Sequence, residues 1–365
     1  MARTPNIRSL MRPHLLNLEP YEGVDPPEVL SERSGIPTER IVKLNGNENP
    51  YGPSPKVASA LACYMSYHIY TDPLQRRVRQ ALSEYADTTQ DRIVAGAGSD
   101  ELIDLLMRLF LDPGDTVIQC TPTFGMYESF AEICGARVLS IPRGNHFEID
   151  LPKVLEAARR GAKMAFIASP NNPTGDLMGE DTAREILATG MLVVIDEAYF
   201  EFAGSTLLAL LGEYPNLVVL RTFSKWAGLA SLRLGYGIMD EAISERLMTI
   251  KPPYNISIAS ELALFASLED KELLLSRVEH LAQSRDELYK SLLEFKELQP
   301  IPSKANFILC RGPLGKGRWL YERLAEHGVF VRYYSNPLLE NYIRITVGLP
   351  DENKTLREAL KVILS

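Results

Sequence analysis

Lys225 is the residue of this chain whose setting most favours covalent chemistry. It follows an apolar run, residues 216–220, that is typical of a buried strand, and Arg233 comes eight positions later. Desolvation and a neighbouring cation both disfavour the ammonium form of a lysine, so both lower its pKa. A lysine with a lowered pKa is a nucleophile that can form a Schiff base. A solvated lysine in a glycine-containing loop is the alternative, and this stretch alone does not exclude it.

Two segments that follow earlier apolar runs carry groups suited to an anion and to a flat ring. In A-G-A-G-S-D-E, residues 95–101, glycines let the backbone approach an anion, and the start of a helix favours phosphate. A glycine turn with a serine or aspartate cap is the alternative. In C-T-P-T-F-G-M-Y, residues 120–127, Phe124 could stack on a planar ring, although core packing is the ordinary role of phenylalanine.

Two later segments supply an amide and a carboxylate. Asn172, in S-P-N-N-P-T-G (residues 169–175), could donate a hydrogen bond to a ligand oxygen or could simply form the turn. Asp196 ends the apolar run of V-V-I-D-E-A-Y (residues 193–199), where a carboxylate usually has a cationic or hydrogen-bonding partner. It could face a pyridinium nitrogen, and Tyr199 could reach the same ligand. A magnesium-binding aspartate is the rival interpretation, but a P-loop and a second acidic ligand are missing.

The five segments together provide an anion cradle, a stacking ring, an amide donor, a carboxylate and an amine. This set suits pyridoxal phosphate, which needs a Schiff-base lysine, a carboxylate at its pyridinium nitrogen and donors at its phosphate. The sequence therefore predicts an enzyme with that cofactor. The histidines show no spacing typical of a metal site, so we expect no metal.

The elements that position these groups alternate along the first two thirds of the chain. Short apolar runs predict strands at residues 92–95, 116–120, 136–141, 164–168, 191–195 and 216–220. Helical patterns lie between them at residues 100–111, 126–133, 151–160 and 182–188. This alternation suits βαβ units, and it predicts an α/β domain of three αβα layers with a mainly parallel sheet. Such sheets bind ligands at the carboxyl ends of their strands, where the candidate groups lie.

The patterns differ before and after this region. Residues 20–55 are rich in proline and glycine and predict extended or turning chain, and helical patterns follow at 57–67 and 74–85. Glycines at positions 228, 235 and 237 predict a loosened backbone after Lys225. Beyond it, a helical stretch at 256–295 with a break near 269–271 precedes strand-like runs and helical patterns, at 306–310, 319–327, 329–332, 342–347 and 352–364.

These patterns predict a second, smaller α+β domain. A chain of 365 residues is long enough for two domains. We expect residues 1–45 to form an N-terminal arm and a segment that packs with the small domain. Residues 46–255 would then form the large domain that binds the cofactor, and residues 256–365 the small domain.

Composition and charge argue against several classes of protein. The net charge of −8 is unlike that of a dedicated nucleic-acid-binding protein. Four cysteines without a C-x-x-C pair argue against a disulfide framework or a zinc site. No apolar run approaches the roughly 18 residues of a membrane helix. The N-terminus lacks the apolar core of a secretory signal, so we expect a cytoplasmic protein whose N-terminal arm lies at a subunit interface.

The chain resembles the fold-type-I pyridoxal-phosphate aminotransferases over nearly its whole length, residues 20–348. The motifs that carry the resemblance are L-N-G-N-E-N-P-Y-G-P, G-A-G-S-D-E, P-T-F-G-M-Y, S-P-N-N-P-T-G, D-E-A-Y, R-T-F-S-K, L-R-L-G-Y, P-P-Y-N-I-S and I-R-I-T-V-G. They occur in the family's order. Within the family, the chain is similar to members that exchange the amino group of L-histidinol phosphate with 2-oxoglutarate in histidine biosynthesis.

The resemblance implies a role for each candidate residue. Lys225 would carry the Schiff base and move protons, and Asp196 would hold the pyridinium proton. Tyr199 and Asn172 would bond the ring oxygen, and Phe124 would stack on the ring. The implied contacts of the cofactor phosphate are Gly98, Ser99, Asp100, Thr222, Ser224 and Arg233, with Tyr70 reaching in from the second subunit of a homodimer.

The resemblance also implies contacts with the substrates. Arg344 would bind the carboxylate of glutamate, next to Asn172. With Arg332, Tyr21 and Tyr254, it would also bind the phosphate of the second substrate. Arginine suits both anions because its planar fork pairs with two oxygens at once. Cross-strand ion pairing is the alternative for the two arginines.

Other activities stay open at this point. Threonine-phosphate decarboxylases and aminotransferases of aromatic amino acids share much of the motif set. A regulator that keeps the fold without catalysis would be expected to lose a catalytic group, and none is lost. The chain departs from the family's common pattern at Gly46, where alanine is usual, at Thr71, where proline is common, and at Phe124, which replaces a frequent tyrosine.

Overall fold

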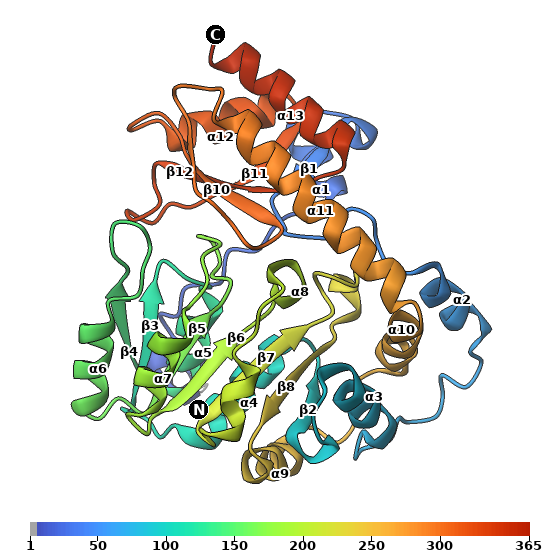
Figure 1. Ribbon diagram of the computed structural model, residues 1–365, viewed down its shortest axis with the longest axis vertical. Helices are drawn as coiled ribbons and strands as arrows, with labels where there is room; N and C mark the ends of the chain where they lie inside the picture. Colours follow the sequence, from blue (N-terminus) through green and yellow to red (C-terminus); the bar gives the residue numbers. More distant parts are fainter. Residues whose placement is uncertain (1–5) are drawn as a thin grey trace, which may run out of the picture.

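The computed structural model describes residues 6–365, which contain two β-sheets flanked by helices (Figure 1). The larger sheet has seven strands in the order β2-β8-β7-β6-β5-β3-β4. Their bounds are β2 Ile93–Gly96, β3 Thr116–Thr121, β4 Arg137–Pro142, β5 Met164–Ala168, β6 Leu192–Asp196, β7 Leu217–Thr222 and β8 Gly235–Met239. All neighbouring pairs are parallel except those of β8 with β2 and β7. The predicted mainly parallel sheet and its six predicted strands are confirmed.

Strand β8 corrects one expectation. The glycines after Lys225 predict a loosened backbone, but Gly235 and Gly237 lie in a strand whose five residues are all buried. A Cβ at position 235 would lie 2.3 Å from the backbone nitrogen of Ser99. Glycine is therefore needed because the strand passes directly against the start of helix α4 (Ser99–Phe110).

Helices cover both faces of this sheet. Alternate residues of a strand point to opposite faces, so Val194 and Leu220 pack on one side while Ile195 and Val219 pack on the other. The first side is covered by α4, α5 (Met126–Cys134) and α9 (Glu241–Ile250). The other side is covered by α3 (Arg76–Ala86), α6 (Leu151–Arg159), α7 (Glu180–Leu187) and α10 (Ile258–Glu269). The predicted three-layer α/β architecture is confirmed.

The smaller sheet lies beyond the carboxyl edge of the larger one (Figure 1). Its order is β1-β11-β12-β10-β9, with bounds β1 Val42–Leu44, β9 Gln299–Pro300, β10 Phe307–Arg311, β11 Val329–Tyr333 and β12 Tyr342–Thr346. It packs with α11 (Lys271–Leu292), α12 (Gly317–Glu326) and α13 (Pro350–Ile363). The N-terminal strand β1 pairs in parallel with β11. The division of the chain at residues 45 and 255 stays a prediction.

The N-terminal third differs from expectation in two helices. The proline-rich stretch 20–55 contains α1 (Pro27–Ser34), because proline in the first turn of a helix loses no hydrogen bond there. Helix α2 (Pro55–Cys63) ends four residues before the predicted end, since Tyr64 is already extended. A short helix, α8 (Phe200–Ala203), follows β6. Within residues 6–365, no helix is long and apolar enough to cross a membrane.

Candidate active site

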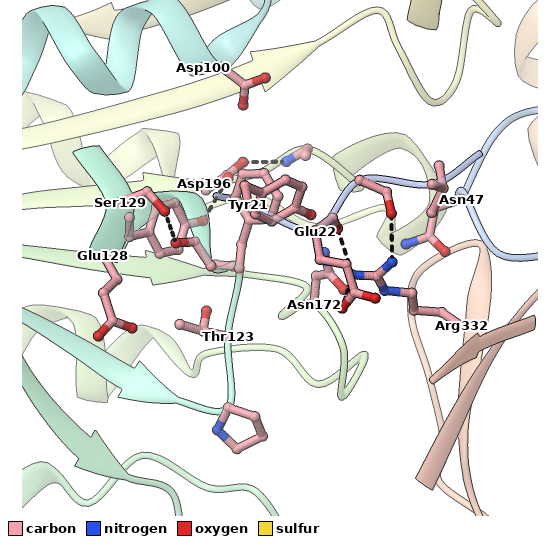
Figure 2. Close-up of a pocket in the computed structure, with 18 of the residues that line it drawn as sticks. Tyr21, Glu22, Asn47, Asp100, Thr123, Glu128, Ser129, Asn172, Asp196 and Arg332 are labelled. Atoms are coloured by element: carbon pink, nitrogen blue, oxygen red, sulfur yellow. Dashed lines mark hydrogen bonds and ion pairs between the residues drawn. The ribbon is translucent and has the colours of Figure 1, made fainter. Parts of the chain in front are cut away.

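A cavity of about 830 Å³ opens at the carboxyl edge of the large sheet and extends to the smaller sheet and the N-terminal segment (Figure 2). Most of the residues singled out from the sequence line it, and they come from eight separate parts of the chain. They are Tyr21, Ser99, Asp100, Phe124, Asn172, Asp196, Tyr199, Thr222, Ser224, Lys225, Arg233, Arg332 and Arg344. The strand ends therefore bring together groups that lie up to 323 positions apart, from 21 to 344.

Lys225 presents its amine to this cavity just after β7. The Nζ atom lies 3.5 Å from the carbonyl oxygen of Gly46, and residues 6–365 give it no carboxylate partner. Burial, together with the positive charge of Arg344, lowers the pKa of Lys225 to about 8. The amine is therefore mainly neutral, and nucleophilic, above pH 8, whereas an ordinary lysine needs a pH above 10.

Asp196 is the last residue of β6 and is buried. One carboxylate oxygen accepts a hydrogen bond of 2.7 Å from the hydroxyl of Tyr127, and the other accepts one of 3.1 Å from the N–H of Ala198. Burial raises the pKa of Asp196 to about 6, against the opposing effect of these two bonds. The group is thus an anion above pH 6, and it can stabilise a cationic ring nitrogen placed beside it.

Tyr199 lies three residues beyond Asp196, and its hydroxyl accepts a hydrogen bond from a residue of the N-terminal part of the chain. The side-chain amide of Asn47 donates to this hydroxyl at 2.9 Å, and the hydroxyl of Thr346 donates to the Asn47 carbonyl oxygen at 3.1 Å. Burial raises the pKa of Tyr199, so its hydroxyl keeps its proton and can donate it to a ligand oxygen.

The start of α4 forms an anion cradle with the segment after β7. Gly98 has a φ of 80°, and a Cβ there would lie 2.5 Å from Nη2 of Arg233. That guanidinium also pairs with the carboxylate of Asp100 at 2.9 Å. Across from it, the hydroxyl of Thr222 donates to that of Ser224 at 2.9 Å. Hydroxyls, a guanidinium and free N–H groups at a helix start are the donors that a phosphate needs.

Two arginines from the smaller sheet reach the same cavity. Nη1 of Arg344 donates to Oδ1 of Asn172 at 2.7 Å, while its Nε atom is buried without a partner. Arg332 donates to the backbone carbonyls of Glu22 and Gly23 at 2.7 and 2.8 Å. Figure 2 shows Arg332 against the N-terminal segment at the side of the cavity away from Asp100. Nη2 of Arg344 also donates to the backbone carbonyl of Asn45, at 2.7 Å. In both arginines the two Nη atoms are therefore already engaged, and an anion that binds either of them must share or replace these bonds.

The aminotransferase class I and II family matches residues 39–363 of the chain. The chain belongs to this family. A histidinol-phosphate aminotransferase of Roseiflexus castenholzii is 46% identical to this chain, and the alignment covers 98% of this chain and 99% of the relative. A chloroplastic histidinol-phosphate aminotransferase of Nicotiana tabacum is 44% identical, and the alignment covers 97% of this chain and 86% of the relative. The crystal structure of histidinol-phosphate aminotransferase from Sinorhizobium meliloti in complex with pyridoxal-5'-phosphate has a TM-score of 0.89 at 28% identity, covering 98% of both chains.

As a member of this family, the chain is a pyridoxal-phosphate-dependent transaminase of fold type I. Its own residues fit the cofactor. Within residues 6–365, no carboxylate pairs with the partly buried amine of Lys225, Asp196 places an anion in the same cavity, and the missing side chain of Gly98 leaves room for Arg233. Within residues 6–365, no group of three or more histidine, cysteine or acidic residues could hold a metal.

Phe124 lines the cavity and packs against two other aromatic rings. Its ring packs edge-on against the rings of Tyr127 and Tyr21, with ring centroids 5.5 and 6.0 Å away, respectively. Tyr21 thereby covers the cavity from the N-terminal segment while half of its surface stays exposed. Both rings line the cavity, and the roles that the resemblance implies for them stay predictions.

Two predicted site residues lie outside the cavity of their own chain. Tyr70 and Tyr254 stack on each other with ring centroids 4.4 Å apart, and both are exposed, Tyr70 by 78%. Neither lines the cavity, within the part of the chain that the structure describes. Gly98 does not line it either, but it packs behind Arg233 as described above. The predicted roles of Tyr70 and Tyr254 are therefore not supported by the cavity of their own chain.

The sequence reasoning missed two residues of the site. Tyr127, whose hydroxyl donates to Asp196, lies in the first turn of α5, in the motif P-T-F-G-M-Y that was quoted for the resemblance without a role for this tyrosine. Asn47, which bonds Tyr199, lies in L-N-G-N-E-N-P-Y-G-P, a motif quoted for the resemblance without a role for this asparagine. Its positive φ of 52° was not readable from the sequence.

Proposed function

We propose that this aminotransferase moves the amino group of L-histidinol phosphate to 2-oxoglutarate, giving imidazole acetol phosphate and glutamate. The observation that carries the proposal is the anion-binding donor set of Arg344 and Asn172 in one cavity with the amine of Lys225. An arginine can bind the carboxylate of 2-oxoglutarate or a substrate phosphate equally well. The names of the relatives at 46% and 44% identity support the choice of L-histidinol phosphate.

The residues of the cavity divide the work of this reaction. Bound pyridoxal phosphate supplies a carbonyl that receives the amino group and a ring that accepts electrons from the Cα–H bond. Lys225 would remove the proton from the substrate Cα. Asp196, an anion above pH 6, would hold the proton on the ring nitrogen, and Tyr199 and Asn172 would donate to the ring oxygen. The cofactor phosphate would be bound by Ser99, Asp100, Thr222, Ser224 and Arg233, with Gly98 behind them.

Binding of the substrate phosphate involves the N-terminal segment. Arg332 now donates to the carbonyls of Glu22 and Gly23, so a phosphate that binds Arg332 must share or replace these bonds. Tyr21, the residue before Glu22, lies in the same segment and lines the cavity. We infer that Tyr21 and Arg332 bind the phosphate together, with Tyr254 supplied by the second subunit.

A panel of amino donors with saturating 2-oxoglutarate tests the proposed substrate. We expect kcat/KM for L-histidinol phosphate to exceed that for phenylalanine or tyrosine by at least about 100-fold, because only the former offers a phosphate to the arginines. Glutamate formation is the measured product. Release of carbon dioxide from threonine phosphate would instead indicate the decarboxylase activity. A protein that shows the cofactor's absorbance but no glutamate formation from L-histidinol phosphate contradicts the proposal.

We also propose that two copies of the chain form a homodimer with shared active sites. Tyr70 and Tyr254 are exposed and do not line the cavity of their own chain, and Met65 and Ile69 expose large apolar side chains on the same segment as Tyr70. An exposed apolar patch of this kind marks an interaction surface. A second copy is the partner that would give both tyrosines a cavity to enter. A cytoplasmic location stays a prediction from the sequence.

Ile69→Lys should weaken this dimer, because it places a charge in the centre of the apolar patch. The wild type should sediment at twice the 40.8 kDa of one chain, and the variant should raise the dimer dissociation constant at least about tenfold. Val362→Lys is the matched control, since Val362 is 65% exposed and Ile69 58%, but it lies in α13. If both variants sediment like the wild type, this patch is not the dimer interface.

A further inference from the structure

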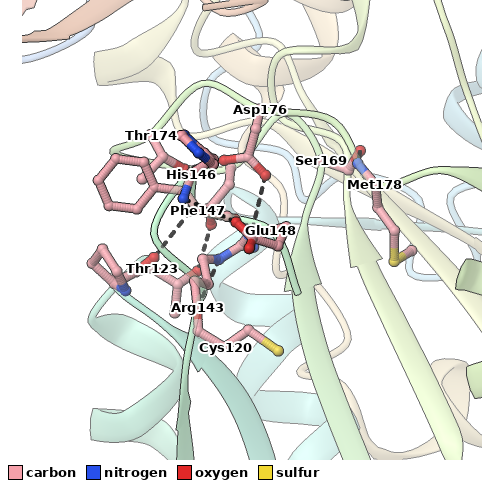
Figure 3. A network of polar contacts seen from close by, with 12 residues as sticks. Cys120, Thr123, Arg143, His146, Phe147, Glu148, Ser169, Thr174, Asp176 and Met178 are labelled. Atoms are coloured by element: carbon pink, nitrogen blue, oxygen red, sulfur yellow. Dashed lines mark hydrogen bonds and ion pairs between the residues drawn. The ribbon is translucent and has the colours of Figure 1, made fainter. Parts of the chain in front are cut away.

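Arg143 is a buried arginine whose bonds the reaction above does not use (Figure 3). It directly follows β4, and only 1% of its side chain is exposed. Nε donates to the carbonyl of Cys120 at 3.1 Å, and Nη1 donates to the carbonyl of Phe147 and the carboxylate of Asp176, both at 2.8 Å. Its backbone N–H donates to the carbonyl of Thr121 at 2.8 Å. A buried guanidinium with these partners has a fixed orientation.

Asp176 connects this arginine to the loop that carries Asn172. The carbonyl of Asp176 accepts a bond of 2.8 Å from the N–H of Asn171, and its carboxylate also accepts from the hydroxyl of Thr174. The side chain of Asn171 in turn accepts from the hydroxyl of Thr123 at 2.8 Å. The loop is thereby tied to the segment after β3, and its shape depends on where Asp176 is held.

Asn172 connects the loop to Arg344. Its Oδ1 atom accepts from Nη1 of Arg344 at 2.7 Å, which leaves the amide N–H groups of Asn172 free for a ligand. Arg143 and Asp176 are absent from the lining of the main cavity as the described residues define it. They can therefore influence a substrate only through the loop.

We propose that the Arg143–Asp176 ion pair is a positioning device that sets Asn172, and through it Arg344, for the anionic group of the substrates. The pair acts on substrate binding, because the hydrogen bonds of Lys225 and Asp196 involve neither of its members. The inference rests on the proposed function in its choice of 2-oxoglutarate as the anion.

Asp176→Ala in the holoenzyme should raise the KM for 2-oxoglutarate about tenfold and leave kcat within about threefold of the wild type. Displacing a binding group by less than an ångström is enough for such a loss. Asp176→Asn keeps an oxygen that can accept from Arg143, and its KM should rise only about threefold. The dissociation constant of maleate, an unreactive dicarboxylate, should rise in parallel when it is followed by the absorbance of the cofactor.

Asp115→Ala is the matched control for loss of an ion-paired aspartate. Asp115 also lies 2.8 Å from its cation, Lys163, and its side chain is 30% exposed against 29% for Asp176. It precedes β3, at the opposite edge of the sheet, so its loss should leave KM and maleate binding unchanged.

The outcomes separate the two proposals. A folded Asp176→Ala variant whose KM and maleate affinity lie within twofold of the wild type overturns the positioning role. If that variant does not fold, unchanged values in Asp176→Asn overturn it. A wild type that binds maleate but gives no glutamate with any donor contradicts the proposed function instead, and maleate binding by the variants still tests the pair.

Discussion

Lys225→Ala should lower kcat at least about 10⁴-fold with L-histidinol phosphate and 2-oxoglutarate, because the variant loses both the nucleophile and the base of the proposed reaction. The partly buried amine, with its pKa lowered to about 8, has no equivalent among the other groups that line the cavity. Glutamate formation under saturating substrates measures the loss. The absorbance of the bound cofactor should also change, since no amine remains to attach it.

Two further variants show whether the amine itself is responsible. Lys225→Arg keeps a positive charge but cannot form a Schiff base, so it should be as inactive as the alanine variant. Lys361→Ala removes an exposed lysine of α13 and should leave kcat unchanged. Activity of the Lys225→Ala protein within about tenfold of the wild type would rule out the assigned role.

Asp196→Asn should lower kcat by about 10³-fold, because an amide cannot hold the proton of the ring nitrogen against a developing negative charge. The carboxylate is buried at the end of β6 with its pKa raised to about 6. It is therefore charged at neutral pH, and residues 6–365 place no ion-paired cation beside it, so the ring nitrogen would be its counter-ion. The measurement is kcat at pH 8, where the wild-type carboxylate is fully ionised.

Tyr127→Phe is a milder change that affects the same carboxylate. It removes the 2.7 Å hydrogen bond to Asp196 but keeps the charge, so kcat at pH 8 should fall by less than about tenfold. This bond lowers the pKa of Asp196, so its loss should raise that pKa. Activity in the variant should consequently be lost at a higher pH than in the wild type as the solution is acidified. An unchanged acid limb would show that Tyr127 does not tune this carboxylate.

Much of the fold could be predicted from the sequence because its elements follow from local patterns of apolar residues. The six predicted strands of the large sheet and the helices between them follow from apolar runs, and their polar ends marked Asn172, Asp196 and Lys225. The break between α10 and α11 at Asp270 was predicted for the same reason. The antiparallel strand β8 and helix α1 were missed because glycine and proline, read locally, indicate loops.

The sequence by itself determined which chemical groups stand at the strand ends, since each follows directly from a local apolar run. Only the tertiary structure decided how they pair: Tyr127 with Asp196, Asn47 with Tyr199, and Asn172 with Arg344 across 172 positions. It also decided that Tyr70 stacks on Tyr254 and does not line the cavity of its own chain. Such pairs depend on strand order and on how closely the two sheets approach each other, and neither produces a periodic pattern in the sequence.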